Sequence, residues 1–400
     1  MTTRILYLEG NEDGTVGGSY YLMLDLVRNL DRGRFEPLVV FHRSNFLEDK
    51  FRECGAEVVV LPKQEPFAFD IALLNRILAP LKKSVNLYRR LLKPAVAHAR
   101  FIRAHDVDLV NLNNSITRNH EWMLAARMAG VPCVTHEMGI NEHYSLASRW
   151  LGKRLGGVIC LSHAIRDTMV ERGAWAGNTC VIHCGIDLSR YEEIESPVAL
   201  RAKHSIPADA PVIGVVGNVR KWKGQETIVR ATALLKDRFP NVRCLLVGGW
   251  TTGDEEYRRL LVGLCDEFQV ADNVIFAGFQ KNAIDYMRLM DVVCHTSTSP
   301  EPFGIVTLEA MSLAKPLVST TIGGPAEVVK HGVTGLLVDP GRPELLADAV
   351  TRLLSDPVHA AEMGRKGRER LLANFSLASN VSQTVMVYER VLEKQGHKRG

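Results

Sequence analysis

Two kinds of apolar pattern alternate along this chain of 400 residues. Short, mostly apolar runs predict buried strands, and longer segments with an apolar residue every three or four positions predict amphipathic helices. In the first half, the predicted strands are Arg4–Glu9, Leu38–Phe41, Glu57–Leu61, Leu109–Leu112, Cys133–Thr135, Gly157–Leu161 and Cys180–Ile182. The predicted helices between them are Tyr20–Leu30, Phe46–Cys54, Ile116–Ala129 and His163–Arg172. Strands that alternate with helices indicate a doubly wound parallel sheet that is covered on both faces.

Three prolines interrupt this alternation between Glu192 and Pro211, and this segment is the predicted linker. Beyond it, strands are predicted at Val212–Val216, Arg243–Val247, Asn273–Ala277, Asp291–His295, Lys315–Thr320 and Gly335–Val338. The chain ends in three predicted helices, Pro343–Leu354, His359–Ala373 and Leu377–Glu393. The sequence therefore predicts two Rossmann-like α/β domains, residues 1–191 and 192–375, and a C-terminal helix within 376–400.

The segment from Ser299 to Met311 carries two carboxylates between a predicted strand and a predicted helix. Glu301 lies in the connecting loop, and Glu309 lies eight positions later in the helix. The amides at the helix start attract anions, because they have no partner within the helix. These amides belong to Phe303, Gly304, Ile305 and Val306. Carboxylates for hydroxyl groups beside amides for phosphate suit a nucleotide sugar, although solvated glutamates at a capped helix start fit the pair as well.

A second strand-to-helix loop, Gly217–Gln225, is rich in cations. It contains Asn218, Arg220, Lys221 and Lys223 between two glycines. Three cations in such a loop suit a diphosphate, whose charge must be neutralised as it leaves. The alternative is a solvated basic loop without a ligand.

Other candidate contacts also follow predicted strands, where ligands of open α/β sheets bind. Gly249 and Phe279 lie in turns that could face a nucleobase, and Gly17 and Gly18 permit close approach of a ligand to the first helix. The first loop lacks G-x-G-x-x-G, so a dinucleotide site is not indicated. His136 follows the predicted strand Cys133–Thr135 and is either structural or a group of the site.

The motif E-P-F-G-x-x-x-L-E-A-M around Glu301 resembles the signature of the retaining family 4 glycosyltransferases, which have the GT-B fold. Further blocks are similar in the same order over about residues 4–375: the glycine-rich first loop, Thr135–Glu137 for the "HD" motif, Val181–Asp187 for "IPNGVD", and Gly217–Gly224 for the "GR…KG" diphosphate clamp. Three positions differ from the family pattern. Glu137 replaces its Asp, His183-Cys184 replaces its Pro-Asn, and Asn218 stands at the place of its arginine.

The resemblance implies a GT-B fold of two domains facing across a cleft, with the acceptor bound by the first and the nucleotide sugar by the second. It also implies that the C-terminal helix, residues 376–400, crosses back to the first domain. It implies that a sugar is transferred from a UDP- or GDP-linked donor to an acceptor hydroxyl with retention, without a metal or other cofactor. Lys223 and Arg220 would neutralise the diphosphate, Glu309 would hold the ribose and Glu301 the sugar hydroxyls. His136 would lie beside the reacting sugar. The alternatives are another GT-B enzyme, such as an epimerase or a phosphorylase, or a non-catalytic subunit that binds a membrane or a protein.

Composition adds limits on partners and compartment. No apolar run approaches the roughly 20 residues that span a bilayer, and the start is a strand pattern, so a cytoplasmic protein is expected. The eight cysteines show no C-x-x-C pair, which fits reduced thiols. Cys180, His183 and Cys184 lie close together, but no second cluster completes four ligands, and no metal is expected. No nucleic-acid partner is expected.

The charge is unevenly distributed. Residues 71–105 contain eight Lys or Arg and no acid, mixed with leucines, and Pro80 and Pro94 divide them into two predicted helices. One interpretation is an interfacial segment that is attracted to anionic lipid on the inner face of the membrane. The other is a helical insert with solvated cations. If lipid binds there, a lipid-linked acceptor is expected, otherwise a glycan.

Overall fold

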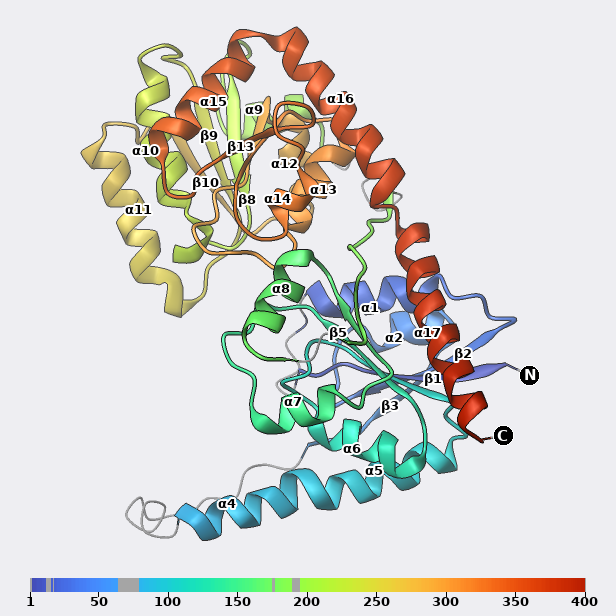
Figure 1. Ribbon diagram of the computed structural model, residues 1–400. Coiled ribbons are helices and arrows are strands. Elements are labelled where there is room, and N and C mark those ends of the chain that lie inside the picture. The colour runs from blue at the N-terminus through green and yellow to red at the C-terminus, as the bar shows by residue number, and fades with distance from the viewer. Residues whose placement is uncertain are drawn as a thin grey trace. The chain divides into compact units, whose positions relative to one another are not determined.

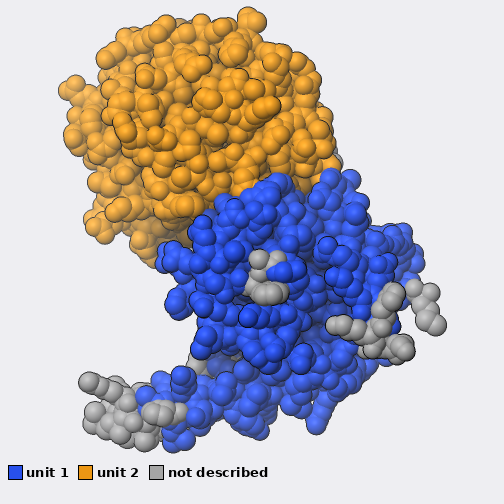
Figure 2. Space-filling view, viewed as in Figure 1, with its two compact units in different colours: residues 1–183, 377–400 blue, residues 184–376 orange. Residues whose placement is uncertain are grey.

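The computed structural model describes residues 2–11, 16, 18–63, 79–174, 177–188 and 195–399. The chain divides into two compact units, one made of Met1–His183 with Leu377–Gly400 and the other of Cys184–Ser376 (Figure 2). Each unit has its own parallel sheet and its own apolar core. The first boundary therefore follows His183, where the sequence places it after Tyr191.

Unit 1 is built on seven parallel strands in the order β3-β2-β1-β4-β5-β6-β7 (Figure 1). The strands are β1 (Thr3–Leu8), β2 (Phe35–Phe41), β3 (Glu57–Val60), β4 (Leu109–Leu112), β5 (Cys133–Glu137), β6 (Gly157–Cys160) and β7 (Thr179–Val181). The strand order reverses between β1 and β4, and such a switch point is where ligands bind in open α/β sheets. The predicted doubly wound sheet is confirmed.

The helices of unit 1 connect these strands and cover the sheet. They are α1 (Gly18–Arg28), α2 (Glu48–Glu53), α4 (Ala79–Leu87), the π-helical turn η1 (Tyr88–Leu92), α5 (Lys93–Ala104), α6 (His120–Ala129), α7 (Leu146–Gly152), α8 (His163–Glu171) and α17 (Leu377–Arg399). The last of them, α17, buries Val387, Tyr388 and Val391 in the same core as β1. The Tyr388 hydroxyl donates to Asn111 Oδ1 at 3.0 Å. Although it is remote in sequence, α17 thus belongs to the packing of unit 1.

Unit 2 has six parallel strands in the order β10-β9-β8-β11-β12-β13. They are β8 (Val212–Val216), β9 (Arg243–Val247), β10 (Val274–Gly278), β11 (Val292–Cys294), β12 (Leu317–Thr320) and β13 (Leu336–Val338). Its helices are α9 (Pro197–Lys203), the 3-10 turn η3 (Lys221–Lys223), α10 (Gln225–Lys236), the 3-10 turn η4 (Thr252–Asp254), α11 (Glu255–Glu267), α12 (Ala283–Leu289), α13 (Ile305–Ser312), α14 (Pro325–Val328), α15 (Pro343–Ser355) and α16 (Pro357–Asn374). The order reverses between β8 and β11, which places the switch point there.

Three local predictions are wrong. The predicted linker contains α9, because Ser196 caps a helix whose first residue is Pro197. The helix predicted from Ile116 begins at His120, since Asn119 is left-handed with φ 56°. Strand β5 extends through Glu137, so that His136 lies within the strand and not after it.

Pro94 does not separate two helices as predicted. The segments α4, η1 and α5 follow one another without a break from Ala79 to Ala104 (Figure 1). A proline ring clashes with the carbonyl four residues earlier in an α-helix. The wider π-helical turn over Tyr88–Leu92 gives that ring room. In the part of the chain that the structure describes, no helix is both long and apolar enough to span a bilayer.

Candidate active site

The switch point of the unit 2 sheet brings together the two loops singled out from the sequence. β8 and β11 are hydrogen-bonded neighbours, and Lys223 follows the first while Glu301 follows the second. The Lys223 ammonium lies 2.5 Å from Glu301 Oε1, and both side chains are mostly buried. Lys223, predicted to bind the diphosphate, and Glu301, predicted to bind the sugar, therefore form an ion pair at the carboxyl edge of the sheet.

Three further side chains around Glu301 were missed by the sequence analysis. His295 Nε2 lies 3.0 Å from Glu301 Oε1, and the Ser297 hydroxyl donates to the same oxygen at 2.5 Å. His295 Nδ1 lies 3.2 Å from the Ser319 hydroxyl of β12. Residues two apart on an extended segment share a face, so the spacing of His295 and Ser297 could have revealed them. Ser319 belongs to another strand, and no spacing in the sequence connects it with Glu301.

This network decides the charge of Glu301. Burial alone would raise the pKa of Glu301. The hydrogen bond and charge of His295, followed by those of Lys223, outweigh burial and hold that pKa well below its usual range. Glu301 is therefore a carboxylate near neutral pH, and Oε1 accepts all three hydrogen bonds.

Backbone hydrogen bonds fix the basic loop against the loop of Glu301. Thr298 N–H donates to the Trp222 carbonyl at 2.9 Å, and the Thr296 hydroxyl donates to the Lys223 carbonyl at 2.9 Å. Gly224 has φ 66° and its missing Cβ would collide with the Thr296 carbonyl, so that only glycine fits there. Hydrogen bonds to the main chain of the basic loop therefore help to position Lys223, in addition to the ion pair of its side chain.

The other residues of the basic loop are more exposed. Asn218 is exposed, and its carbonyl accepts a hydrogen bond from Gln225. The Arg220 side chain is 45% exposed, with Nε 3.8 Å from Asp254 Oδ2. Arg220 therefore lies in the loop as predicted, but it is oriented by η4 and does not contact Glu301 among the pairs that the structure shows.

The turns after β9 and β10 lie side by side. A Cβ at Gly249 would stand 3.3 Å from that of Phe279, and the Gly248 N–H donates to the Gly278 carbonyl at 2.9 Å. Phe279 is 75% exposed and Trp250 is 40% exposed. Exposed rings beside the basic loop offer flat faces on which a nucleobase could pack. The two predicted base-contact positions are thus brought together.

The start of α13 is held by two tight backbone contacts. Gly304 caps the helix with φ 76°, and a Cβ at Gly323 would come within 2.5 Å of the Glu301 carbonyl. Phe303 is buried with its ring centroid 6.2 Å from that of Phe375, so its side chain supports the loop. Ile305, Val306 and Glu309 are half-buried, and Glu309 lies in the second turn of α13.

In unit 1, His136 is buried near the carboxyl end of β5. Burial lowers the pKa of its imidazole to about 4, so that the ring is neutral near pH 7. Its Nε2 has no hydrogen-bond partner among the described residues. The adjacent Glu137 accepts hydrogen bonds from Ile116 N–H at 2.9 Å and Ser115 at 2.7 Å, and fastens the loop after β4. Neutral His136 can therefore act as a hydrogen-bonding group but not as an acid.

The switch point of unit 1 carries a polar cluster that the sequence analysis also missed. The Glu9 carboxylate after β1 accepts hydrogen bonds from Asn113, at 2.6 Å, and from Asn114. Burial raises the pKa of Glu9 despite these donors. Gly18 begins α1, and a Cβ there would meet nothing within 4 Å. Gly17 lies outside the described residues.

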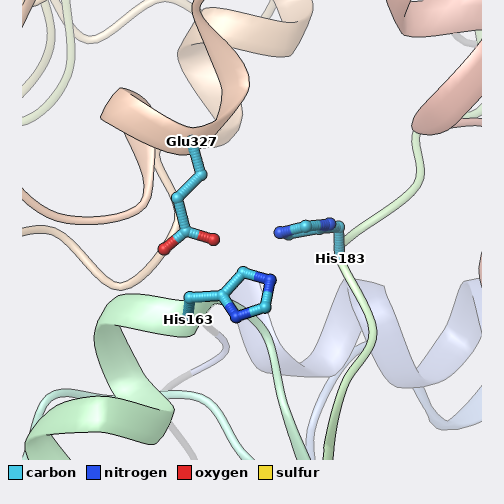
Figure 3. Close-up of side chains that lie close together, drawn as sticks. All are labelled: His163, His183 and Glu327. Atoms are coloured by element: carbon cyan, nitrogen blue, oxygen red, sulfur yellow. The ribbon is translucent and has the colours of Figure 1, made fainter.

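The segment after β7 shows no cysteine–histidine metal cluster among the described residues. The His183 ring lies instead against the ring of His163, the first residue of α8, with centroids 5.8 Å apart and planes at 63° (Figure 3). Burial raises the pKa of both Cys180 and Cys184, which keeps these thiols protonated and poor metal ligands.

Comparison with known proteins identifies the family. The model described as Glycosyltransferase Family 4 matches residues 16–190, and the model described as Glycosyl transferases group 1 matches residues 199–370. D-inositol 3-phosphate glycosyltransferase of Kineococcus radiotolerans is 30% identical over 334 residues, which are 76% of this chain and 76% of that protein. Lipopolysaccharide core biosynthesis glycosyltransferase LpsE of Rhizobium meliloti is 35% identical over 219 residues, 55% of this chain and 60% of that protein.

Solved structures agree with these matches. The crystal structure of Anabaena Alr3699/HepE in complex with UDP has a TM-score of 0.81 and 26% identity, and covers 97% of this chain and 100% of that one. The same protein in complex with UDP-glucose has a TM-score of 0.76 and 26% identity, and covers 96% and 99%. The chain therefore belongs to the group 1, family 4 glycosyltransferases and has their GT-B fold.

Proposed function

We propose that the protein transfers a sugar from a nucleoside-diphosphate sugar, linked to UDP or GDP, to an acceptor hydroxyl with retention of configuration. The observation that carries this proposal is the meeting of Lys223 and Glu301 at the switch point of the unit 2 sheet. The similarity to a protein solved with UDP and with UDP-glucose supports a nucleotide-sugar donor. The names of relatives that act on an inositol phosphate and in lipopolysaccharide synthesis favour glycan, glycolipid or cell-surface polysaccharide synthesis.

In this proposal, unit 2 binds the donor through the basic loop, the start of α13 and the turns after β9 and β10. Lys223 turns from Glu301 to the diphosphate, Arg220 adds a second charge, and the amides at the start of α13 bind phosphate oxygens. Glu309 accepts hydrogen bonds from the ribose. The nucleobase packs beside Gly249 and Phe279.

In this proposal, Glu301 accepts hydrogen bonds from hydroxyls of the transferred sugar, and neutral His136 is a further hydrogen-bonding group for that sugar. The bond from the anomeric carbon to the diphosphate breaks, and a bond to the acceptor oxygen forms on the same face. The acceptor proton passes to the departing phosphate. Charge compensation by Lys223 and Arg220 supplies the electrostatic stabilisation of the leaving group, so we propose that no metal is required. Transfer that persists in EDTA tests this point.

Calorimetric titration with UDP and GDP tests the donor site. Lys223→Ala and Glu309→Ala each remove a charge-assisted hydrogen bond, which is worth about 1.5–3 kcal/mol. We expect at least about tenfold weaker binding of the preferred nucleotide in each variant. Lys221→Ala is the matched control, because Lys221 is an exposed cation of the same turn. Equal weakening by Lys221→Ala, or unchanged affinity in both site variants, would reject the assignment.

We also propose that the protein is cytoplasmic and associates with the inner face of the membrane through its basic helix. The described part of that helix, Ala79–His105, carries seven Lys or Arg and no acid. Attraction to anionic lipid contributes about 1 kcal/mol per cation near the surface. A lipid-linked acceptor would then be presented to unit 1. The eight residues 71–78 of the predicted basic segment lie outside the described part of the chain.

A further inference from the structure

Unit 1 contains an apolar cavity that the proposed sugar transfer does not use. It has a volume of about 600 Å³, within the usual range for ligand sites. Its wall is formed by Leu91 of η1, Leu124 of α6, and Leu146, Ala147, Trp150 and Leu151 of α7. Figure 1 shows these helices on the side of unit 1 where the long helix formed by α4, η1 and α5 runs. The cavity is thus walled by three separate helices.

Large apolar side chains are also exposed on α7 and on the long helix, which contribute Leu146 and Leu91 to the wall. Leu146 is 83% exposed and Trp150 is 47% exposed, and Leu87, Tyr88 and Leu92 of the long helix are each about half exposed. Leu146 is held in place, because Ser145 caps α7 by accepting a hydrogen bond from Ser148 N–H at 3.1 Å. A gathered group of exposed apolar side chains beside a cavity marks an interaction site, whereas scattered ones do not.

The charges at the rim identify the kind of partner. Arg149 and Lys153 line the cavity together with its apolar side chains, and the long helix that contributes Leu91 carries seven Lys or Arg and no acid from Ala79 to His105. The Arg154 guanidinium lies 3.9 Å from the centre of the Trp150 ring, so that a cation and an apolar face are presented together. The partner must therefore be apolar and anionic at once. A second copy of the chain would place the same positive charge against itself.

We infer that this cavity binds an acyl chain of an anionic lipid, whose phosphate lies against the cations of α4, η1 and the end of α7. The inference rests on the proposed membrane association and gives it a defined site. Lys153 and Arg154 follow Trp150 at the rim, and Lys82, Lys83 and Arg89 lie on the long helix. Lys and Arg stems can lie along apolar surface while their charged ends remain in water. The site thus combines salt-sensitive attraction with salt-insensitive burial of an acyl chain.

Vesicle flotation tests the inference with the whole chain. The probes are vesicles of phosphatidylcholine with phosphatidylglycerol and vesicles of phosphatidylcholine alone, at low and high salt. We expect binding to the anionic vesicles only. Partitioning should be at least about tenfold weaker in Leu146→Glu, because a carboxylate would then face the lipid in place of an apolar side chain. Val358→Glu is the matched control, since Val358 is 82% exposed on α16 of unit 2.

A second measurement separates the cavity from the surface charge. Ala147→Trp fills the cavity and leaves every cation in place, so we expect weaker retention at high salt with little change at low salt. Equal partitioning of wild type, Leu146→Glu and Ala147→Trp would overturn the inference, as would absence of binding. Self-association in sedimentation velocity that Leu146→Glu abolishes would also overturn it, in favour of a second copy. UDP titration is independent of all these outcomes and reports separately on the donor site.

Discussion

Lys223 has two partners in the proposed reaction, the Glu301 carboxylate in the structure and the donor diphosphate. Moving the ammonium from one to the other leaves a buried carboxylate with less compensation, and that is costly at a poorly hydrated site. His295 reduces this cost, because its Nε2 lies 3.0 Å from the same oxygen. With Nδ1 lying 3.2 Å from the Ser319 hydroxyl, the imidazole is oriented so that Nε2 can donate to Glu301.

His295→Ala should therefore weaken nucleoside-diphosphate binding although His295 is not expected to touch the ligand. Without the imidazole, Lys223 is held more strongly by Glu301, and we expect a loss of about 1–3 kcal/mol in calorimetric titration. His295→Gln retains a donor and should restore part of the affinity. Unchanged affinity in His295→Ala would show that Lys223 does not need this compensation.

A pH dependence is expected from Glu137. Burial raises its pKa to about 7, although Ile116, Ser115, Asn141 and Tyr144 all donate to it. A carboxyl whose folded pKa is raised contributes stability that is complete below the unfolded pKa near 4.5 and lost as pH rises through 7. The unfolding free energy of wild type minus that of Glu137→Gln should thus fall by about 3 kcal/mol between pH 4.5 and 7. Urea unfolding measures it.

An increase with pH in the difference in unfolding free energy between wild type and Glu137→Gln would contradict this prediction. If the difference grows with pH, the four hydrogen-bond donors outweigh burial and Glu137 is ionised in the folded protein. His136 beside it loses stability in the other direction, as pH falls from 6.5 towards 4. Because wild type and Glu137→Gln both contain His136, the contribution of His136 to the unfolding free energy cancels when the two proteins are compared.

At the scale of elements, Ser196 and Pro197 show how a proline can begin a helix as well as interrupt one. The Ser196 hydroxyl accepts a hydrogen bond from Ala199 N–H at 3.2 Å, and Pro197 occupies the first turn. Ser196→Ala should lower the stability of unit 2 by about 1 kcal/mol. Ser196→Asp, which can also cap, should restore it in the same thermal unfolding experiment. A fully stable alanine variant would mean that α9 is fixed by packing alone.

The elements that sequence patterns predicted are those determined by local signals. The apolar runs of both sheets and the start of α8, which Ser162 caps, lie where expected, because periodicity and capping act within a few residues. The two wrong predictions for helices, the start of α6 and the break at Pro94, depend on backbone conformations that the sequence pattern does not reveal. Asn119 adopts a left-handed conformation before α6. A π-helical turn precedes Pro94, and apolar periodicity does not distinguish such a turn from an α-helix.

At the scale of the whole chain, the site depends on strand order, which local patterns do not contain. Lys223 and Glu301 are 78 residues apart and meet because β8 lies beside β11. The family motif brought them together in the sequence analysis, and spacing alone did not. Glu9 and Asn113, 104 residues apart, meet through β1 and β4 in the same way and had no motif to reveal them. The pairing of strands that are far apart in the sequence therefore cannot be predicted from local patterns.

A hydrogen bond between residues far apart in the sequence gives the last prediction. Tyr388 of α17 is fully buried and donates to Asn111 of β4, 277 residues earlier, so α17 should stabilise unit 1 specifically. Tyr388→Ala removes a large buried ring at a cost of about 3–5 kcal/mol. Amide hydrogen exchange in β1 and β4 should then become at least about a hundredfold faster, while exchange in β8 and β11 is unchanged. Tyr286→Ala, an equally buried tyrosine of unit 2, should do the reverse. Faster exchange in both sheets with either variant would mean that the two cores unfold as one, and that the division at His183 and Ser376 has no energetic counterpart.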